Sequence, residues 1–204
     1  MYLAAAGIGT LVLCDFDKLE LSNLQRQIIH DTDNLGMAKV KSAAGRIKSL
    51  NPGCETIIFD KKLSEQELSH QIEMADIVVD ASDNFETRFS INRQSRIHQT
   101  PLVSAAAIRY EAQISIFNQT GTSPCYHCLY KEDQADEDLS CSANGVLGPV
   151  LGIAGSMQAL EVIKIQCGLG NTLDGRLVLF DALAHEWRTI KLKQDPNCPV
   201  CSSL

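Results

Sequence analysis

Short apolar runs alternate with helical patterns through the first half of the chain, and this alternation is the strongest constraint on the fold. Strands are predicted at residues 11–14, 56–59, 77–79 and 102–105. Between them, apolar residues recur at spacings of three and four, which predicts helices at about 37–50, 64–74 and 85–98. Strands separated by helices need crossover connections. The pattern therefore predicts an α/β fold whose parallel sheet is covered by helices on both faces, with 77–79 buried on both sides.

The second half has a different rhythm. Strands joined by turns are predicted at 111–118, 176–181 and 186–192, which indicates an antiparallel C-terminal extension of the sheet. A long helix over about 148–166 is apolar on most faces, so we expect it to be buried. The stretch "KEDQADEDLS" is acidic and nearly without core residues, and we expect a mobile loop at 131–141.

Bulk composition limits the class of protein. A chain of 204 residues with 45% hydrophobic and 21% charged residues can bury one core, so we expect a single domain over 1–204. A net charge of −7 argues against a nucleic-acid surface, which needs clustered basic residues. The sequence contains neither a long apolar span nor a signal-peptide pattern, so we expect a cytoplasmic protein without membrane contact.

Four of the eight cysteines form two C-x-x-C pairs, "CYHC" at 125–128 and "CPVC" at 198–201. Four thiolates are the full ligand set of a closed structural zinc site, which predicts zinc at Cys125, Cys128, Cys198 and Cys201. The alternatives are a redox pair or inert thiols. A redox motif should open a helix after a strand, and the residues around "CYHC" do not suggest one. We expect His127 to be a bystander. The small core cysteines are predicted to be Cys14, Cys54 and Cys167.

Polar residues follow two of the predicted strands. Asp15 begins the stretch "DFDKLELSNLQRQ" after 11–14, and "DASDN" follows 77–79. Ligands of open parallel sheets sit outside the carboxyl ends of the strands, so these residues are candidates for a nucleotide site. Simpler interpretations remain open at this point. Asp15 could end its strand in a turn, Asn23 could form an Asx turn, and Asp83 with Glu86 has the form of a helix capping box. Solvated surface charges are the simpler interpretation of Arg26 and Lys39.

Four motifs in order resemble the bacterial adenylyltransferases that activate sulfur-carrier proteins. They are "DFDKLELSNLQRQIIH", "NLGMAKV", "DASDNFETR" and "CSANGVLGPVLGIAGSMQALEVIK". This family contains the molybdopterin-synthase and thiazole-pathway enzymes and is related to the ubiquitin-activating enzymes. The resemblance covers essentially the whole chain. It implies a Rossmann-like, doubly wound and mostly parallel sheet, a homodimer, and ATP, Mg²⁺ and Zn²⁺ as cofactors.

The resemblance also implies a reaction and its partner, a small ubiquitin-like sulfur-carrier protein that ends in Gly-Gly. The carrier's terminal carboxylate attacks the α-phosphorus of ATP, which releases pyrophosphate and leaves an acyl-adenylate. Such a transfer depends mainly on positioning and on stabilising phosphoryl charge. The implied catalytic residues are Arg26, Lys39, Asp83 and Cys141. The implied nucleotide-binding residues are Asp15, Ser22, Asn23, Arg26, Lys39, Asp83 and Asn84.

Individual roles follow from the same match. Asp15 would hold the ribose, Asn23 and Arg26 would reach the phosphates, Lys39 would neutralise them, and Asp83 would bind Mg²⁺ while also capping its helix.

Cys141 matches the position where the thiazole-pathway enzyme bears a cysteine that links to its carrier. A loop cysteine without a role is the alternative. The sequence does not choose between a molybdopterin and a thiazole carrier, although "DALAHEWR" and "SPCYHCLY" lean towards the former.

The sequence departs from this family at its front. Residues 1–13 suggest the end of a helix, a turn at Gly7 and Gly9, and a strand, without the family's first strand, its G-x-G-G-x-G turn or an upstream arginine. We therefore expect a fragment or a degraded member that binds ATP poorly by itself. Ala112, where relatives usually have glycine, is a lesser departure. The competing functions are adenylylation of another carboxylate and a non-catalytic dimerisation module.

Overall fold

The computed structural model describes residues 1–132 and 145–201, and the chain divides into two units, Met1–Ser64 and Glu65–Leu204. Unit 1 contains two strands, two α-helices and two short 3₁₀ helices. Their bounds are α1 Tyr2–Ala5, β1 Thr10–Cys14, η1 Leu21–Asn23, η2 Thr32–Asn34, α2 Lys39–Leu50 and β2 Glu55–Phe59. The expectation of one domain over 1–204 stays a prediction.

The two strands of unit 1 form a parallel pair that runs from Thr10 opposite Glu55 to Cys14 opposite Phe59. A small core holds the pair against the helices. Its buried members are Ala4, Ile47 and Cys54, with Leu11, Leu13 and Ile29 packed against them. The helix end, glycine turn and strand expected at the front are all present, and Gly7 makes the turn with a φ of 95°.

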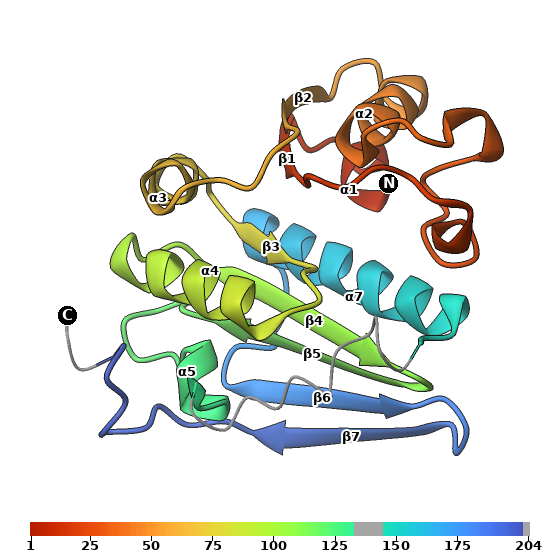
Figure 1. Cartoon of the computed structure of the whole chain (residues 1–204). Coiled ribbons are helices and arrows are strands. Elements are labelled where there is room, and N and C mark those ends of the chain that lie inside the picture. The colour runs from red at the N-terminus through yellow and green to blue at the C-terminus, as the bar shows by residue number, and fades with distance from the viewer. Residues whose placement is uncertain (133–144, 202–204) are drawn as a thin grey trace. The chain divides into compact units, whose positions relative to one another are not determined.

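Unit 2 is built on a five-stranded sheet with the order β3-β4-β5-β6-β7 (Figure 1). The strands are β3 Val78–Asp80, β4 Leu102–Ile108, β5 Glu111–Phe117, β6 Arg176–Asp181 and β7 Glu186–Lys191. The helices are α3 Glu65–Glu73, α4 Phe85–Ile97, α5 Tyr126–Leu129 and α7 Gly148–Cys167. Strands β3 and β4 are parallel, and every later pair is antiparallel. The predicted α/β class with an antiparallel C-terminal extension is thus confirmed.

Aromatic side chains hold α4 and α5 to the sheet. Leu102 of β4 and Phe117 of β5 form a buried cluster with Phe89 of α4 and Tyr126 of α5. The Tyr126 ring meets Phe117 edge-on, with centroids 5.6 Å apart, and meets Phe89 in the same way at 5.4 Å. Edge-to-face pairs of this kind add to the stabilisation from buried area. The cluster fixes the start of the first C-x-x-C pair, because Tyr126 lies inside it.

Three expectations about burial are wrong. Helix α7 buries residues such as Val150 and Val162, but Leu160 on another face is 54% exposed. Strand β3 is not buried on both faces, since Val79 is 39% exposed. Of the three cysteines assigned to the core, Cys54 is buried whereas Cys14 and Cys167 are exposed. A search of the described residues finds no helix long and apolar enough to span a membrane.

Candidate functional site

The residues that follow β1 fold back onto the first turn of α2. Oδ1 of Asp15 accepts a hydrogen bond from the Asp17 N–H at 2.8 Å, so the turn interpretation of Asp15 is confirmed. Oδ2 of Asp17 then pairs with Nζ of Lys39 at 2.7 Å, and the Asp17 carbonyl accepts from the Lys39 N–H at 2.9 Å. The Lys39 side chain is only 11% exposed. The structure thus brings Asp15 and Lys39 together through Asp17, which the sequence did not single out.

The stretch "SNLQRQ" forms the 3₁₀ helix η1 and the turn after it. Asn23 is buried, and its Oδ1 accepts a hydrogen bond from the Glu20 N–H at 3.1 Å, which caps η1. Nη1 of Arg26 donates to the Ser22 carbonyl at 2.9 Å. Ser22 itself is exposed and donates to a Glu20 carboxylate oxygen at 3.4 Å. These polar residues therefore stabilise the conformation of their own loop.

His30 lies beside this group and was missed by the sequence analysis. Its Nδ1 is 2.8 Å from the Ser42 hydroxyl in α2. Burial, followed by the nearby positive charge of Lys39, lowers the pKa of His30 below its usual value. A histidine inside the quoted motif was the available signal, but periodicity gave no reason to place its ring near Lys39.

In unit 2 the predicted capping box is wrong. Helix α4 is capped by Asn84, whose Oδ1 accepts from the Thr87 N–H at 2.9 Å. Asp83 precedes the cap, and its carboxylate is exposed, with Oδ1 at 3.4 Å from Nδ2 of Asn84. Capping therefore does not occupy the carboxylate that the sequence assigned to Mg²⁺.

The predicted nucleotide-binding residues divide between the units. Unit 1 holds Asp15, Ser22, Asn23, Arg26 and Lys39, and unit 2 holds Asp83 and Asn84. Their convergence on one nucleotide stays a prediction. Cys141 lies outside the described residues, as does most of the predicted loop at 131–141. The first residues of that loop are anchored, since Lys131 pairs with Asp195 at 2.7 Å and Glu132 pairs with Arg93 at 3.4 Å.

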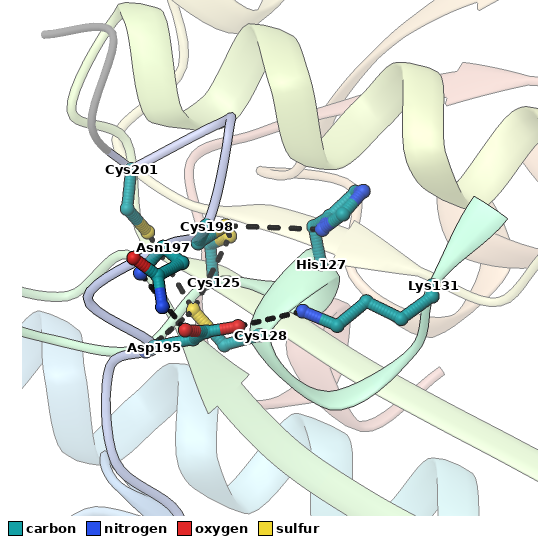
Figure 2. Close-up of polar contacts among 8 residues, drawn as sticks. All are labelled: Cys125, His127, Cys128, Lys131, Asp195, Asn197, Cys198 and Cys201. Atoms are coloured by element: carbon teal, nitrogen blue, oxygen red, sulfur yellow. Dashed lines mark hydrogen bonds and ion pairs between the residues drawn. The ribbon is translucent and has the colours of Figure 1, made fainter.

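The two C-x-x-C pairs meet in unit 2. Sγ of Cys125 lies 3.8 Å from Sγ of Cys128 and 3.6 Å from Sγ of Cys198, and Sγ of Cys128 lies 3.6 Å from Sγ of Cys201 (Figure 2). All four sulfurs lie within 4.8 Å of one another. Four sulfurs bound to one zinc ion at about 2.3 Å would lie about 3.8 Å apart. The donor set and its spacing therefore fit a tetrahedral zinc ion.

One argument against the redox alternative fails, and another replaces it. Cys125 is the N-cap of α5, so "CYHC" does open a short helix, and the expectation that it would not is wrong. The seven cysteines in the described part of the chain are not joined by disulfides. A redox pair needs two thiols, whereas four converge here, and Cys125 and Cys198 are fully buried.

Polar neighbours surround the cluster. Nδ1 of His127 lies 3.8 Å from Sγ of Cys198, so the histidine is in contact with one sulfur of the cluster (Figure 2). The Asp195 N–H donates to Sγ of Cys128 at 3.4 Å. A hydrogen bond from Cys125, together with that N–H, lowers the pKa of the Cys128 thiol to about 4. The same hydrogen bond raises the pKa of the Cys125 thiol, so without a metal ion the two thiols of this C-x-x-C pair share one proton.

The model of the ThiF family matches residues 1–200. The chain belongs to the ThiF family. It is 40% identical over 200 residues to the molybdopterin-synthase adenylyltransferase of Escherichia coli, with 98% of this chain and 80% of that protein covered. It is also 40% identical over 204 residues to the adenylyltransferase and sulfurtransferase MOCS3 of Drosophila virilis.

That alignment covers 99% of the chain and 45% of MOCS3, and the chain spans about half of the length of the animal relatives. Among solved structures, E. coli MccB with ATP has a TM-score of 0.84 at 23% identity, over 97% of this chain and 60% of MccB. PaaA has a TM-score of 0.77 at 20% identity, over 95% of this chain and 61% of PaaA. These likenesses confirm the Rossmann-like fold of the ThiF-family chain.

Proposed function

We propose that this ThiF-family chain adenylylates the C-terminal glycine carboxylate of a small ubiquitin-like sulfur-carrier protein. The observation that carries the proposal is the 40% identity to a molybdopterin-synthase adenylyltransferase over 98% of the chain. The name of that relative also favours a carrier of molybdopterin synthesis over one of thiazole synthesis. In the reaction, a carrier carboxylate oxygen bonds to the α-phosphorus of ATP while the bond to pyrophosphate breaks.

Unit 1 supplies the groups for the ribose and the phosphates. Lys39 provides a positive charge that Asp17 holds at the first turn of α2. When the triphosphate binds, its oxygens pair with Nζ of Lys39, either in place of the Asp17 carboxylate or together with it. We assign Oδ2 of Asp15 to a ribose hydroxyl, because Oδ1 is engaged by the Asp17 N–H. Nδ2 of Asn23 and the guanidinium of Arg26 are assigned to phosphate oxygens, with Ser22 at the rim.

Unit 2 supplies the metal ligand. Carboxylate oxygens are preferred Mg²⁺ ligands, and Asp83 presents its carboxylate to solvent directly before the Asn84 cap. Bound Mg²⁺ would neutralise charge on the phosphates. Asn84 orients Asp83 through its amide nitrogen while its oxygen caps α4.

Further parts of the proposal concern the zinc ion, the oligomeric state, the location in the cell and Cys141. Zinc in the Cys₄ cluster would link the C-terminal segment to α5 and stabilise unit 2. It would not contact the reacting groups. We also propose a cytoplasmic location, because two C-x-x-C pairs of free thiols are typical of a reducing compartment. A homodimer, and a carrier link at Cys141, are proposed from the family resemblance alone.

Exchange of labelled pyrophosphate into ATP tests the proposed function. We expect the intact protein to catalyse exchange with Mg²⁺ and a carrier that ends in Gly-Gly, because the acyl-adenylate step is reversible. The same carrier without its last glycine is the matched control and should support none. Exchange that does not depend on the carrier, or no exchange with any Gly-Gly carrier, would overturn the proposal.

A further inference from the structure

Asp80, the last residue of β3, is a buried carboxylate. Its side chain is 1% exposed and lies in the sheet of unit 2. Oδ2 accepts a hydrogen bond from the Ser104 hydroxyl at 3.1 Å, which follows from the register that pairs Asp80 with Ser104. Nε2 of Gln158 in α7 donates to the main-chain carbonyl of Asp80 at 2.8 Å. Partners from β4 and α7 therefore fix both the backbone and the side chain of Asp80.

The other carboxylate oxygen of Asp80 holds Ser82. Oδ1 accepts both the Ser82 N–H, at 2.9 Å, and the Ser82 hydroxyl, at 2.7 Å. The Ser82 carbonyl in turn accepts a hydrogen bond from Nη2 of Arg88, a buried arginine in α4. The N–H, the hydroxyl and the carbonyl of Ser82 are thus all engaged by charged side chains. Hydrogen bonds to charged groups are stronger than neutral ones, so Ser82 is firmly fixed.

Asp83 sits between two fixed residues. Ser82 is held on its N-terminal side, and Asn84 is held on its C-terminal side as the cap of α4. Between them the Asp83 carboxylate is exposed. An exposed carboxylate on a free loop would sample many positions and lose entropy on binding a metal, whereas a loop with both neighbours anchored has paid that cost during folding.

We infer that Asp80 is a positioning residue, which fixes the 80–84 loop and through it the carboxylate of Asp83. The inference rests on the proposed function for the role of Asp83 in Mg²⁺ binding, but the anchoring of the loop can be measured without it. Asp80 acts through an oxygen acceptor at a fixed place. A neutral residue with an oxygen acceptor in the same place should therefore hold Ser82 in the same way.

Amide hydrogen exchange tests the anchoring in the intact protein. In Asp80→Ala, the Ser82 amide loses its acceptor, so its exchange should accelerate by about tenfold or more. Asp80→Asn keeps an oxygen acceptor for Ser82, and the Ser104 hydroxyl can rotate to accept from the new amide. Exchange in this variant should stay within about threefold of wild type. If Asp80→Ala does not fold, Ser82→Ala, which removes the hydroxyl donor to the same Asp80 oxygen, should accelerate exchange of the amide at position 82.

The Mg²⁺ dependence of pyrophosphate exchange tests the consequence for Asp83. The half-saturating Mg²⁺ concentration should rise about tenfold or more in Asp80→Ala and return to within about threefold of wild type in Asp80→Asn. Ser115→Ala is the matched control. It removes another buried hydroxyl of the same sheet, which donates to the Arg176 carbonyl at 2.9 Å and not to Asp80. This control should leave the Mg²⁺ dependence unchanged.

Three results would overturn the inference. Unchanged Ser82 exchange in Asp80→Ala would show that the carboxylate does not hold the loop. An equal rise in the Mg²⁺ requirement in Ser115→Ala would show a general loss of stability instead. A rise in Asp80→Asn as large as in Asp80→Ala would assign the effect to charge rather than position. If the wild-type protein shows no pyrophosphate exchange, the proposed function fails, and Ser82 amide exchange still decides whether Asp80 anchors the loop.

Discussion

The loops that follow β1 and β3 use the same residue types but are anchored in opposite ways. After β1, Asp17 holds Lys39 through an ion pair in which the aspartate is 52% exposed. After β3, Asp80 holds Ser82 from a position that is 1% exposed. Exposed ion pairs contribute little to stability, whereas buried charged acceptors are costly to remove. The first loop can therefore exchange partners when a ligand arrives, and the second is fixed before it arrives.

The largest effect is expected when the carboxylate of Asp83, in the loop after β3, is removed. Asp83→Ala should reduce carrier-dependent pyrophosphate exchange by about a hundredfold or more, because a charge-stabilising group is removed from the transition state. The fold should survive, since Asn84 rather than Asp83 caps α4. Exchange rates with circular dichroism on the same sample measure both. Wild-type exchange by a folded Asp83→Ala protein would remove Asp83 from the site.

The next effect compares the two members of the ion pair between the largely buried Lys39 side chain and the half-exposed Asp17. Lys39→Met should lower pyrophosphate exchange by about a hundredfold, while unfolding free energy changes by less than about 1 kcal/mol. Asp17→Asn keeps an oxygen near Nζ and should change the exchange rate by only a few fold. Steady-state rates and urea melts of both variants provide the measurement. Equal losses in both variants would mean that Asp17 is a required member of the site rather than a replaceable partner.

Removal of the metal ion should lower the stability of unit 2 around the cysteine cluster and leave that of unit 1 unchanged. We expect one zinc atom per chain by metal analysis, lost in Cys198→Ser because three thiolates no longer close the tetrahedron. Amides around Asp195 and α5 should then exchange faster, while amides of β1 and β2 stay protected. Cys167→Ser is the matched control, since Cys167 is exposed and outside the cluster. A metal-free wild-type protein with all amides protected would reject the zinc assignment.

The smallest effect is a pH dependence confined to unit 1. The pKa of His30 is lowered in the folded state, by burial first and by Lys39 second. The unfolded chain therefore binds a proton more readily, so stability should fall as pH drops below the ordinary histidine pKa of about 6.5. His30→Gln should reduce the fall in unfolding free energy with decreasing pH. Urea unfolding between about pH 7.5 and about pH 5.5 measures this difference. Identical slopes in both proteins would show that His30 titrates normally.

Much of this fold follows from local patterns in the sequence. The strands at 11–14 and 102–105 lie within β1 and β4, because short apolar runs between helical segments are typical of strands in this class. The two C-x-x-C pairs also converge as expected, because four thiols in two such pairs are the ligand set of a closed zinc site. The exposed faces of α7 and β3 were not predictable, because an apolar pattern does not say which apolar residues a neighbour will cover.

The candidate site was harder to predict, for identifiable reasons. Asp83 and Asn84 are both good capping residues. A shift of the helix start by one residue decides whether the Asp83 carboxylate or the Asn84 amide caps α4. Asp80 resembled a possible ligand at a strand end, but its burial depends on Ser104 and Gln158, which come from distant parts of the chain. His30 approaches Lys39 only because the loop after η1 returns to α2. Local sequence carries none of these long-range contacts.

The most direct test of the account is a crystal structure of the intact protein with Mg²⁺ and a non-hydrolysable ATP analogue. The account predicts one nucleotide with Asp15 at the ribose, Lys39 at the phosphates and Asp83 bound to the metal ion. It also predicts that the 80–84 loop keeps its contacts with Asp80 while Lys39 changes partner. A bound nucleotide that touches only one of the two units, or Asp83 far from the metal ion, would contradict it.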